Sequence, residues 1–162
     1  EEGLMRTWFH DSSQAYPERE IPILSAATVL VSSEADGSPI ANAFDNTRGP
    51  GATQWIAGET GVQILIISFH QRQTIRRVTM EVEEREISRT QEVHLAVSSN
   101  GGETYRELLR QEFTFNPDST TWECEDWTVA EFNVTHVKLS IRPDKGRHDC
   151  TAKLTSLVLA DA

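Results

Sequence analysis

Residues 40–55 have the sequence IANAFDNTRGPGATQW, and this stretch decides the fold more than any other part of the chain. It places Asp45 just before a loop rich in glycine, and Thr53 and Trp55 follow that loop. Glycine and proline at such short intervals predict a turn or loop rather than a helix or strand. The densest apolar run of the chain follows at residues 62–69, and we expect it to be a central strand covered on both faces.

From this run to the C-terminus, apolar residues recur at every second position, which is typical of half-buried antiparallel strands. The alternation is clearest around Val78, Leu95 and Leu139, and we expect these three residues to be buried between two sheets together with Trp55 and Ile66. Residues 103–112 contain good helix formers and leave a short helix open as an alternative. The Asn-Gly-Gly turn before them is a strong hairpin signal, so a strand is favoured there.

The order Asn-Ala-x-Asp-Asn, glycine-rich loop, Thr-x-Trp and dense strand resembles the discoidin domain, also called the coagulation-factor type C or galactose-binding-like domain. Five further segments resemble strands of that family in the same order: residues 25–28, 75–80, 93–102, 134–141 and 154–159. The resemblance implies an all-β fold, an eight-stranded antiparallel jelly-roll β-sandwich that serves mainly as a binding module. We expect this sandwich to cover residues 22–162, with residues 1–21 as an N-terminal arm packed on it.

The resemblance also implies a calcium site in the glycine-rich loop, with Asp45 giving its carboxylate, Asn42 its backbone carbonyl, and Thr53 its hydroxyl and carbonyl. Such oxygens are the ligands that Ca²⁺ takes in proteins. Many members of the family supply a glutamate from the closing strand, where this chain has Ser156. We therefore expect at most a weak, structural Ca²⁺ site. The alternative is that Asp45 and Thr53 only fasten the loop through hydrogen bonds.

Variable loops at one end of the sandwich carry the ligand in this family, and the loops at residues 83–89 and 145–149 are the candidates here. Arg89, Arg147 and His148 are the expected hydrogen-bond donors, and Trp122 or Trp8 is the expected stacking platform. A sugar site needs such an apolar plane together with a few convergent polar groups. The alternative is that these charged loops are merely solvated and that the tryptophans belong to the core, as we expect for Trp55.

Composition narrows the classes of function. The chain has 162 residues, 38% of them hydrophobic and 25% charged, which suits one globular domain. Its formal net charge of −10 disfavours nucleic acid, whose binding depends on neutralising phosphates. Membrane binding is not expected, because the candidate loop tips are mostly acidic or mixed. We found no nucleophile elbow, zinc-protease motif, P-loop or dinucleotide fingerprint, so enzyme activity is not expected.

Cys124 and Cys150 fit no metal-binding spacing, and we expect two buried free thiols rather than a disulfide. The first residues carry no secretory signal pattern, which together with free thiols favours the cytoplasm over secretion. The leading interpretation is a non-catalytic module that binds carbohydrate. An intracellular protein-interaction or scaffold domain of the same fold is the alternative.

Overall fold

The structure of the protein is a computed structural model that describes residues 19–162, so residues 1–18 of the expected arm lie outside the described residues. Among residues 19–162, no helix is long and apolar enough to cross a membrane. The elements in chain order are α1 (Ile23–Ala26), β1 (Ala27–Val31), a 3₁₀ helix (Ile40–Phe44), β2 (Trp55–Thr60), β3 (Gln63–Glu83), β4 (Arg89–Ser98), β5 (Arg106–Phe115), β6 (Trp122–Arg142), β7 (Thr151–Leu154) and β8 (Ser156–Ala160).

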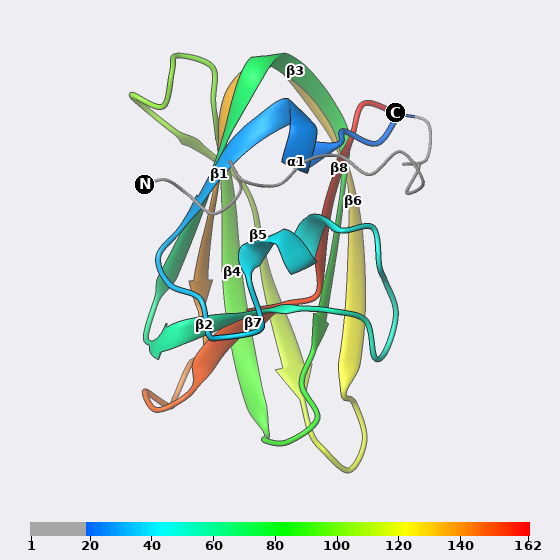
Figure 1. The fold of residues 1–162 in the computed structure, drawn as a ribbon, viewed down its shortest axis with the longest axis vertical. Helices are drawn as coiled ribbons and strands as arrows, with labels where there is room; N and C mark the ends of the chain where they lie inside the picture. Colours follow the sequence, from blue (N-terminus) through cyan, green and yellow to red (C-terminus); the bar gives the residue numbers. More distant parts are fainter. Residues whose placement is uncertain (1–18) are drawn as a thin grey trace.

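Two long strands, β3 and β6, organise the whole molecule. Each has 21 residues, and they pair antiparallel along most of their length. Their register shifts between Ser68 and Arg77, and both strands bend over there, at the upper end of Figure 1. One half of each strand therefore lies in the first layer of a sandwich, and the other half lies in the second layer. The expected eight-stranded antiparallel β-sandwich is confirmed.

Strands β1, β4 and β8 each pair with one half of β3 or β6, and β5 extends the first layer by pairing with β4. The first layer has the order β1-β3-β6-β4-β5, and β8 pairs with the second half of β3 in the other layer. A separate two-stranded sheet, β2 with β7, closes the side near the glycine-rich loop. The segment at residues 103–112 enters strand β5, as favoured over a helix, and the expected closing strand at 154–159 is divided at Thr155 between β7 and β8.

The core lies between the two layers and follows the alternation of the strands. Trp55, Val78, Leu95 and Leu139 are all buried, as predicted. The Trp55 indole also donates its Nε1–H to the carbonyl of Ser33 at 3.0 Å. A buried indole N–H needs such a partner, so this bond fixes the orientation of the largest core side chain.

The expectation that residues 62–69 are covered on both faces is wrong, and with it the predicted burial of Ile66. Leu65 and Ile67 point inward and are buried, whereas Ile66 lies half-buried on the outer face. Its neighbour in the register is Leu30 of β1, which is itself exposed. The outer face of this layer is open to solvent, and the dense apolar run is an alternating strand with apolar residues on both faces.

Residues 19–21 of the expected arm pack against the end of the sandwich. Ile21 is buried and its N–H donates to the carbonyl of Leu159 at 2.8 Å. Arg19 accepts a backbone hydrogen bond from Asp161 at 2.9 Å and donates its Nε–H to the Asp161 carboxylate at 2.6 Å. The first and last described residues therefore lie side by side on one edge of the molecule.

Both cysteines are free, as predicted. Cys150 is buried, but the predicted burial of Cys124 is wrong, because its position on β6 faces solvent. Partial desolvation, and then the nearby carboxylate of Glu81, raise the pKa of the Cys124 thiol. The exposed thiol is therefore kept in its protonated form.

The two faces of the first layer differ in burial, so truncating a side chain on each face should lower the free energy of unfolding by different amounts. Leu95→Ala empties a fully buried position and should lower the free energy of unfolding by about 2–5 kcal/mol. Ile66→Ala, on the half-open outer face, should cost clearly less than Leu95→Ala. Urea denaturation followed by tryptophan fluorescence measures both. Equal losses for the two variants would contradict the assignment of the faces.

Candidate functional site

The glycine-rich loop is closed on itself by Asp45. One carboxylate oxygen of Asp45 accepts the Thr47 N–H at 3.0 Å and the Thr47 hydroxyl at 2.7 Å. The other oxygen accepts the Thr53 hydroxyl at 2.5 Å, and that hydroxyl lies 3.4 Å from the carbonyl oxygen of Asn42. Three of the four predicted metal-binding residues thus come together, in the arrangement of hydrogen bonds expected for a fastened loop.

The same loop is held from below by two glutamates of β3 that the sequence analysis missed. Glu81 accepts the N–H of Gly49 at 2.8 Å, and Glu83 accepts the N–H of Gly51 at 3.1 Å. Both carboxylates are buried. Gly49 and Gly51 have φ values of 88° and 86°, which side chains other than glycine rarely adopt. The glycines and the glutamates together fix the path of the loop.

Ser156, the fourth predicted metal-binding residue, lies buried on β8 opposite Glu81. It lines a cavity of about 20 Å³ beneath the loop, together with Ala43 and Arg48. That volume holds about one water molecule, so the cavity is no ligand site.

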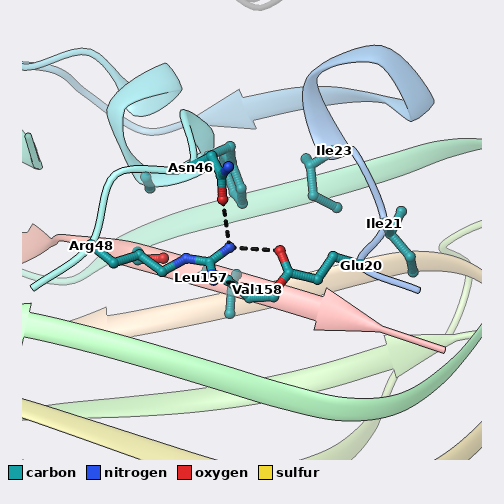
Figure 2. Close-up of a pocket in the computed structure, with 10 residues that line it drawn as sticks. Glu20, Ile21, Ile23, Asn46, Arg48, Leu157 and Val158 are labelled. Atoms are coloured by element: carbon teal, nitrogen blue, oxygen red, sulfur yellow. Dashed lines mark hydrogen bonds and ion pairs between the residues drawn. The ribbon is translucent and has the colours of Figure 1, made fainter. Parts of the chain in front are cut away.

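Arg48 closes this small cavity on its outer side. Figure 2 shows its guanidinium between the side chains of Asn46 and Glu20, at 2.9 Å from the Asn46 amide oxygen and 2.6 Å from a Glu20 carboxylate oxygen. The loop is therefore tied to the segment that precedes β1.

The oxygen atoms of the loop are of the kind that bind a hard cation, but only one carboxylate is among them. Asp45 supplies that carboxylate, and Asn42 and Thr53 supply neutral oxygens within 3.4 Å of one another. In the part of the chain that the structure describes, no three His, Cys, Asp or Glu side chains gather where they could hold a metal ion. Affinity for Ca²⁺ rises with the number of charged ligands, so this set predicts a weak site.

Three loops gather at the lower end of Figure 1, and we call residues 84–88, 116–121 and 143–150 the loop end. Their mutual contacts are direct. The Glu84 N–H donates to the carbonyl of Thr121 at 2.8 Å, and Thr90, which follows the first loop on β4, donates its N–H to the carboxylate of Asp144 at 2.7 Å. The loops therefore form one connected surface.

Arg89 anchors this surface from inside, and its predicted role as an exposed donor is wrong. Its side chain is 1% exposed and forms an ion pair at 2.7 Å with Glu84, which is 2% exposed. It also donates to the carbonyls of Pro143, at 3.1 Å, and Thr151, at 2.7 Å. Burial works to raise the pKa of Glu84, but the Glu86 N–H and the charges of Lys153 and Arg89 hold that pKa below its usual value. Glu84 is thus a buried anion with full compensation.

The other predicted ligand-binding residues also lie at the loop end. Arg147 and His148 are exposed, and the Arg147 guanidinium donates to the carboxylate of Asp149 at 3.0 Å. Trp122 pairs in register with Glu83, is half-buried, and has a buried Nε1–H without a hydrogen-bond partner among residues 19–162. Trp122 is therefore only partly exposed, and its role as a stacking platform stays a prediction.

A cleft of about 260 Å³ separates the glycine-rich loop from the loop end. We call it the polar cleft, and its lining residues are Gly51, Ala52, Gln54, Glu83, Arg85, Glu86 and Lys153. Arg85 is exposed and is held by Glu83 at 2.7 Å, and Lys153 lies 3.3 Å from Glu84. Donors and acceptors thus converge in fixed positions. Lys153 was not among the predicted site residues, and β7 brings it beside the loop at residues 84–88.

Comparison with known proteins is consistent with this architecture. The sequence model of the F5/8 type C domain matches residues 27–153. A search of curated proteins returned no match.

Solved structures with the same fold are family 32 carbohydrate-binding modules and related modules. The NanJ module of Clostridium perfringens, solved with galactose, has a TM-score of 0.57 and 15% identity over 87% of this chain and 97% of its own. The AlyQ module, solved with 4,5-unsaturated mannuronic acid, has a TM-score of 0.60 and 17% identity over 85% and 96%. A chitosan-binding module from Paenibacillus sp. IK-5 has a TM-score of 0.57 and 19% identity over 83% and 94%.

The buried ion pair gives a direct test of what holds the loop end. Arg89→Ala leaves the Glu84 carboxylate buried without its main partner and should lower the free energy of unfolding by about 3–5 kcal/mol. The control Arg110→Ala removes the same charge from an exposed pair with Glu107 and should cost less than about 1 kcal/mol. Chemical denaturation at neutral pH compares the two variants. Similar small losses in both would show that the pair does not anchor the loops.

Proposed function

The chain belongs to the F5/8 type C domain family, and from this premise we propose that it is a non-catalytic module that binds carbohydrate through the loop end. The single observation that carries this proposal is the polar cleft, in which charged donors and acceptors converge beside the loops. Several solved modules of this fold are described with a bound sugar, which supports the same class of ligand.

The polar cleft has the chemistry to hold sugar hydroxyls. Arg85 and Lys153 donate, and Glu86 accepts. Gly51 and Gln54, on the opposite wall, belong to a loop that Glu81 and Glu83 hold in place. Because the walls are fixed before binding, little conformational freedom is lost when a ligand enters. Arg147 and His148 lie exposed on the adjoining loop and extend the polar surface.

The two buried carboxylates beside the polar cleft, Glu83 and Glu84, support binding rather than catalysis. Glu84 is committed to Arg89 and Lys153, and Glu83 to the Gly51 N–H and to Arg85. A general acid or base has to exchange a proton with the substrate. The oxygens of both carboxylates are already engaged by these partners. We therefore propose no reaction at this surface.

Isothermal titration with galactose, N-acetylgalactosamine and uronic-acid oligosaccharides tests the proposal. We expect binding of at least one of these sugars with a Kd below the millimolar range. Arg85→Ala should weaken it about 10-fold or more, because a lost hydrogen bond to a charged group costs about 1.5–3 kcal/mol. The control Arg110→Ala, which removes a distant exposed arginine, should bind as the unaltered protein does. Failure to bind any glycan on a broad array would contradict the proposal.

We also propose that the glycine-rich loop binds Ca²⁺ weakly. Asp45, Asn42 and Thr53 would hold the ion, which would neutralise the carboxylate and link the 3₁₀ helix to the start of β2. The Thr53 hydroxyl donates to Asp45 without the ion, so the loop is formed in either case.

Melting curves separate the ion from the hydrogen bonds. A ligand that binds only the native state stabilises it by RT ln(1 + [L]/Kd). We expect the melting temperature to rise at millimolar Ca²⁺, with no rise at micromolar Ca²⁺, and Asp45→Ala to abolish the rise. An unchanged melting temperature at about 10 mM Ca²⁺, above the Kd of the weakest extracellular calcium sites, would remove the ion from the proposal.

A further inference from the structure

We propose that a second cleft, at the end of the sandwich opposite to the loop end, binds a saccharide ring that carries a carboxylate. The cleft has a volume of about 250 Å³, and we call it the Tyr105–Phe132 cleft. The lining residues used here are Ser99, Thr104, Tyr105, Arg106, Glu131 and Phe132. The inference rests on the proposed carbohydrate-binding function but assigns a different site.

The two clefts lie at opposite ends of the same strands. Strand β4 begins with Arg89 at the loop end and finishes with Ser98, which lines the Tyr105–Phe132 cleft. Ten residues of extended strand span about 30 Å. Figure 1 shows the turn from β4 to β5 at the upper end, away from the three lower loops. A monosaccharide bound in one cleft therefore cannot touch the other.

The Tyr105–Phe132 cleft has the apolar plane that the lining of the polar cleft lacks. Phe132 is 54% exposed, and the other large apolar side chains exposed among residues 19–162, Leu30 and Val62, are aliphatic. The Arg76 guanidinium lies 5.2 Å from the centre of the Phe132 ring, and the Lys138 ammonium lies 4.5 Å from that of Tyr105. These contacts fix the two rings, so their remaining surface is ready to receive the apolar face of a sugar.

The polar wall of the cleft is rigid. The Ser98 hydroxyl accepts the N–H groups of Asn100, at 3.2 Å, and Gly102, at 3.0 Å, inside the turn. Arg72 then joins the turn to β6 by donating to the carbonyls of Ser99, at 2.9 Å, and Asn133, at 3.0 Å. Binding to such a wall requires no reordering of the backbone.

The charges around the cleft favour an anion. Arg106 is 65% exposed and ion-paired with Glu131, the one acidic residue of the lining. Three further cations lie nearby. Arg72 contacts backbone carbonyls, and Arg76 and Lys138 contact aromatic rings. The nearby acids are Glu103, exposed in the turn, and Glu107, which pairs with Arg110. On a chain of net charge −10, this local excess of cations stands out.

These features together define the ligand. Glu131 accepts from Nη2 of Arg106, and a carboxylate can receive two parallel hydrogen bonds from the exposed N–H groups that remain on this guanidinium. The ring would lie against Phe132, and its hydroxyls would reach Thr104 and the Tyr105 phenol. Burial raises the pKa of Tyr105, so its hydroxyl stays protonated and able to donate. A uronic-acid residue has all three groups.

The test is an NMR titration of the ¹⁵N-labelled protein with tri-galacturonate, alongside its neutral counterpart, galactotriose. We expect tri-galacturonate to shift the amide signals of residues 99–106 and 131–134. Phe132→Ala and Arg106→Ala should each weaken this binding by about tenfold, the loss typical of a central contact. Leu30→Ala and Arg110→Ala, matched exposed positions on β1 and β5, should leave it unchanged. Because Phe132 and Arg106 are exposed, all four variants should melt near the unaltered protein.

The outcomes separate the two proposals. One outcome is that amide signals shift at residues 83–86 and 153 only, with binding weakened only in Arg85→Ala. This result would overturn the Tyr105–Phe132 site and leave the proposed function standing. Shifts confined to the Tyr105–Phe132 cleft would support this inference and remove the loop end as the sugar site. Equal binding of galactotriose would overturn the requirement for a carboxylate. No shift with any saccharide would overturn both proposals.

Discussion

The antiparallel pairing of β3 with β6 is the constraint on which the rest of the structure depends. Because both strands are long enough to bend over together, one pair of strands supplies the centre of both layers. Every other strand except β2, β5 and β7 pairs directly with one of the two. Shortening either strand would therefore remove a neighbour from both sheets at once. The bend also places the Phe132 segment of β6 at one end of the molecule and the Trp122 start of the same strand at the other.

Buried acids are a second theme of this acidic chain, and they act mainly as acceptors. Glu81 and Glu83 accept backbone N–H groups of the glycine-rich loop, and Glu84 accepts both backbone N–H groups and the Arg89 guanidinium. A carboxylate is costly to bury unless its oxygens are satisfied. Here Glu81 and Glu83 are satisfied by the glycine-rich loop, and Glu84 by its own loop together with Arg89 and Lys153. The positions of the loops are consequently set by β3, which carries or precedes all three acids.

The sequence predicted the sandwich because alternation is a local property. Val78, Leu95 and Leu139 could be placed in the core from their immediate neighbours. Ile66 could not, since an apolar residue between apolar residues gives no sign of which face is covered. Arg89 looked like a solvated loop residue, because the partners that bury it, Pro143 and Thr151, are remote in the chain. The Tyr105–Phe132 cleft is likewise formed by segments that only the bend of β6 brings together.

The adjacency of Arg19 and Asp161 sets how the sandwich can be carried by a larger polypeptide. A chain that enters at Arg19 and leaves at Asp161 does so at nearly one point, because the two residues share a backbone hydrogen bond and an ion pair. Closely spaced ends let a folded unit sit within a surface loop of a host protein without stretching that loop. The unit is then joined to its host through one edge only.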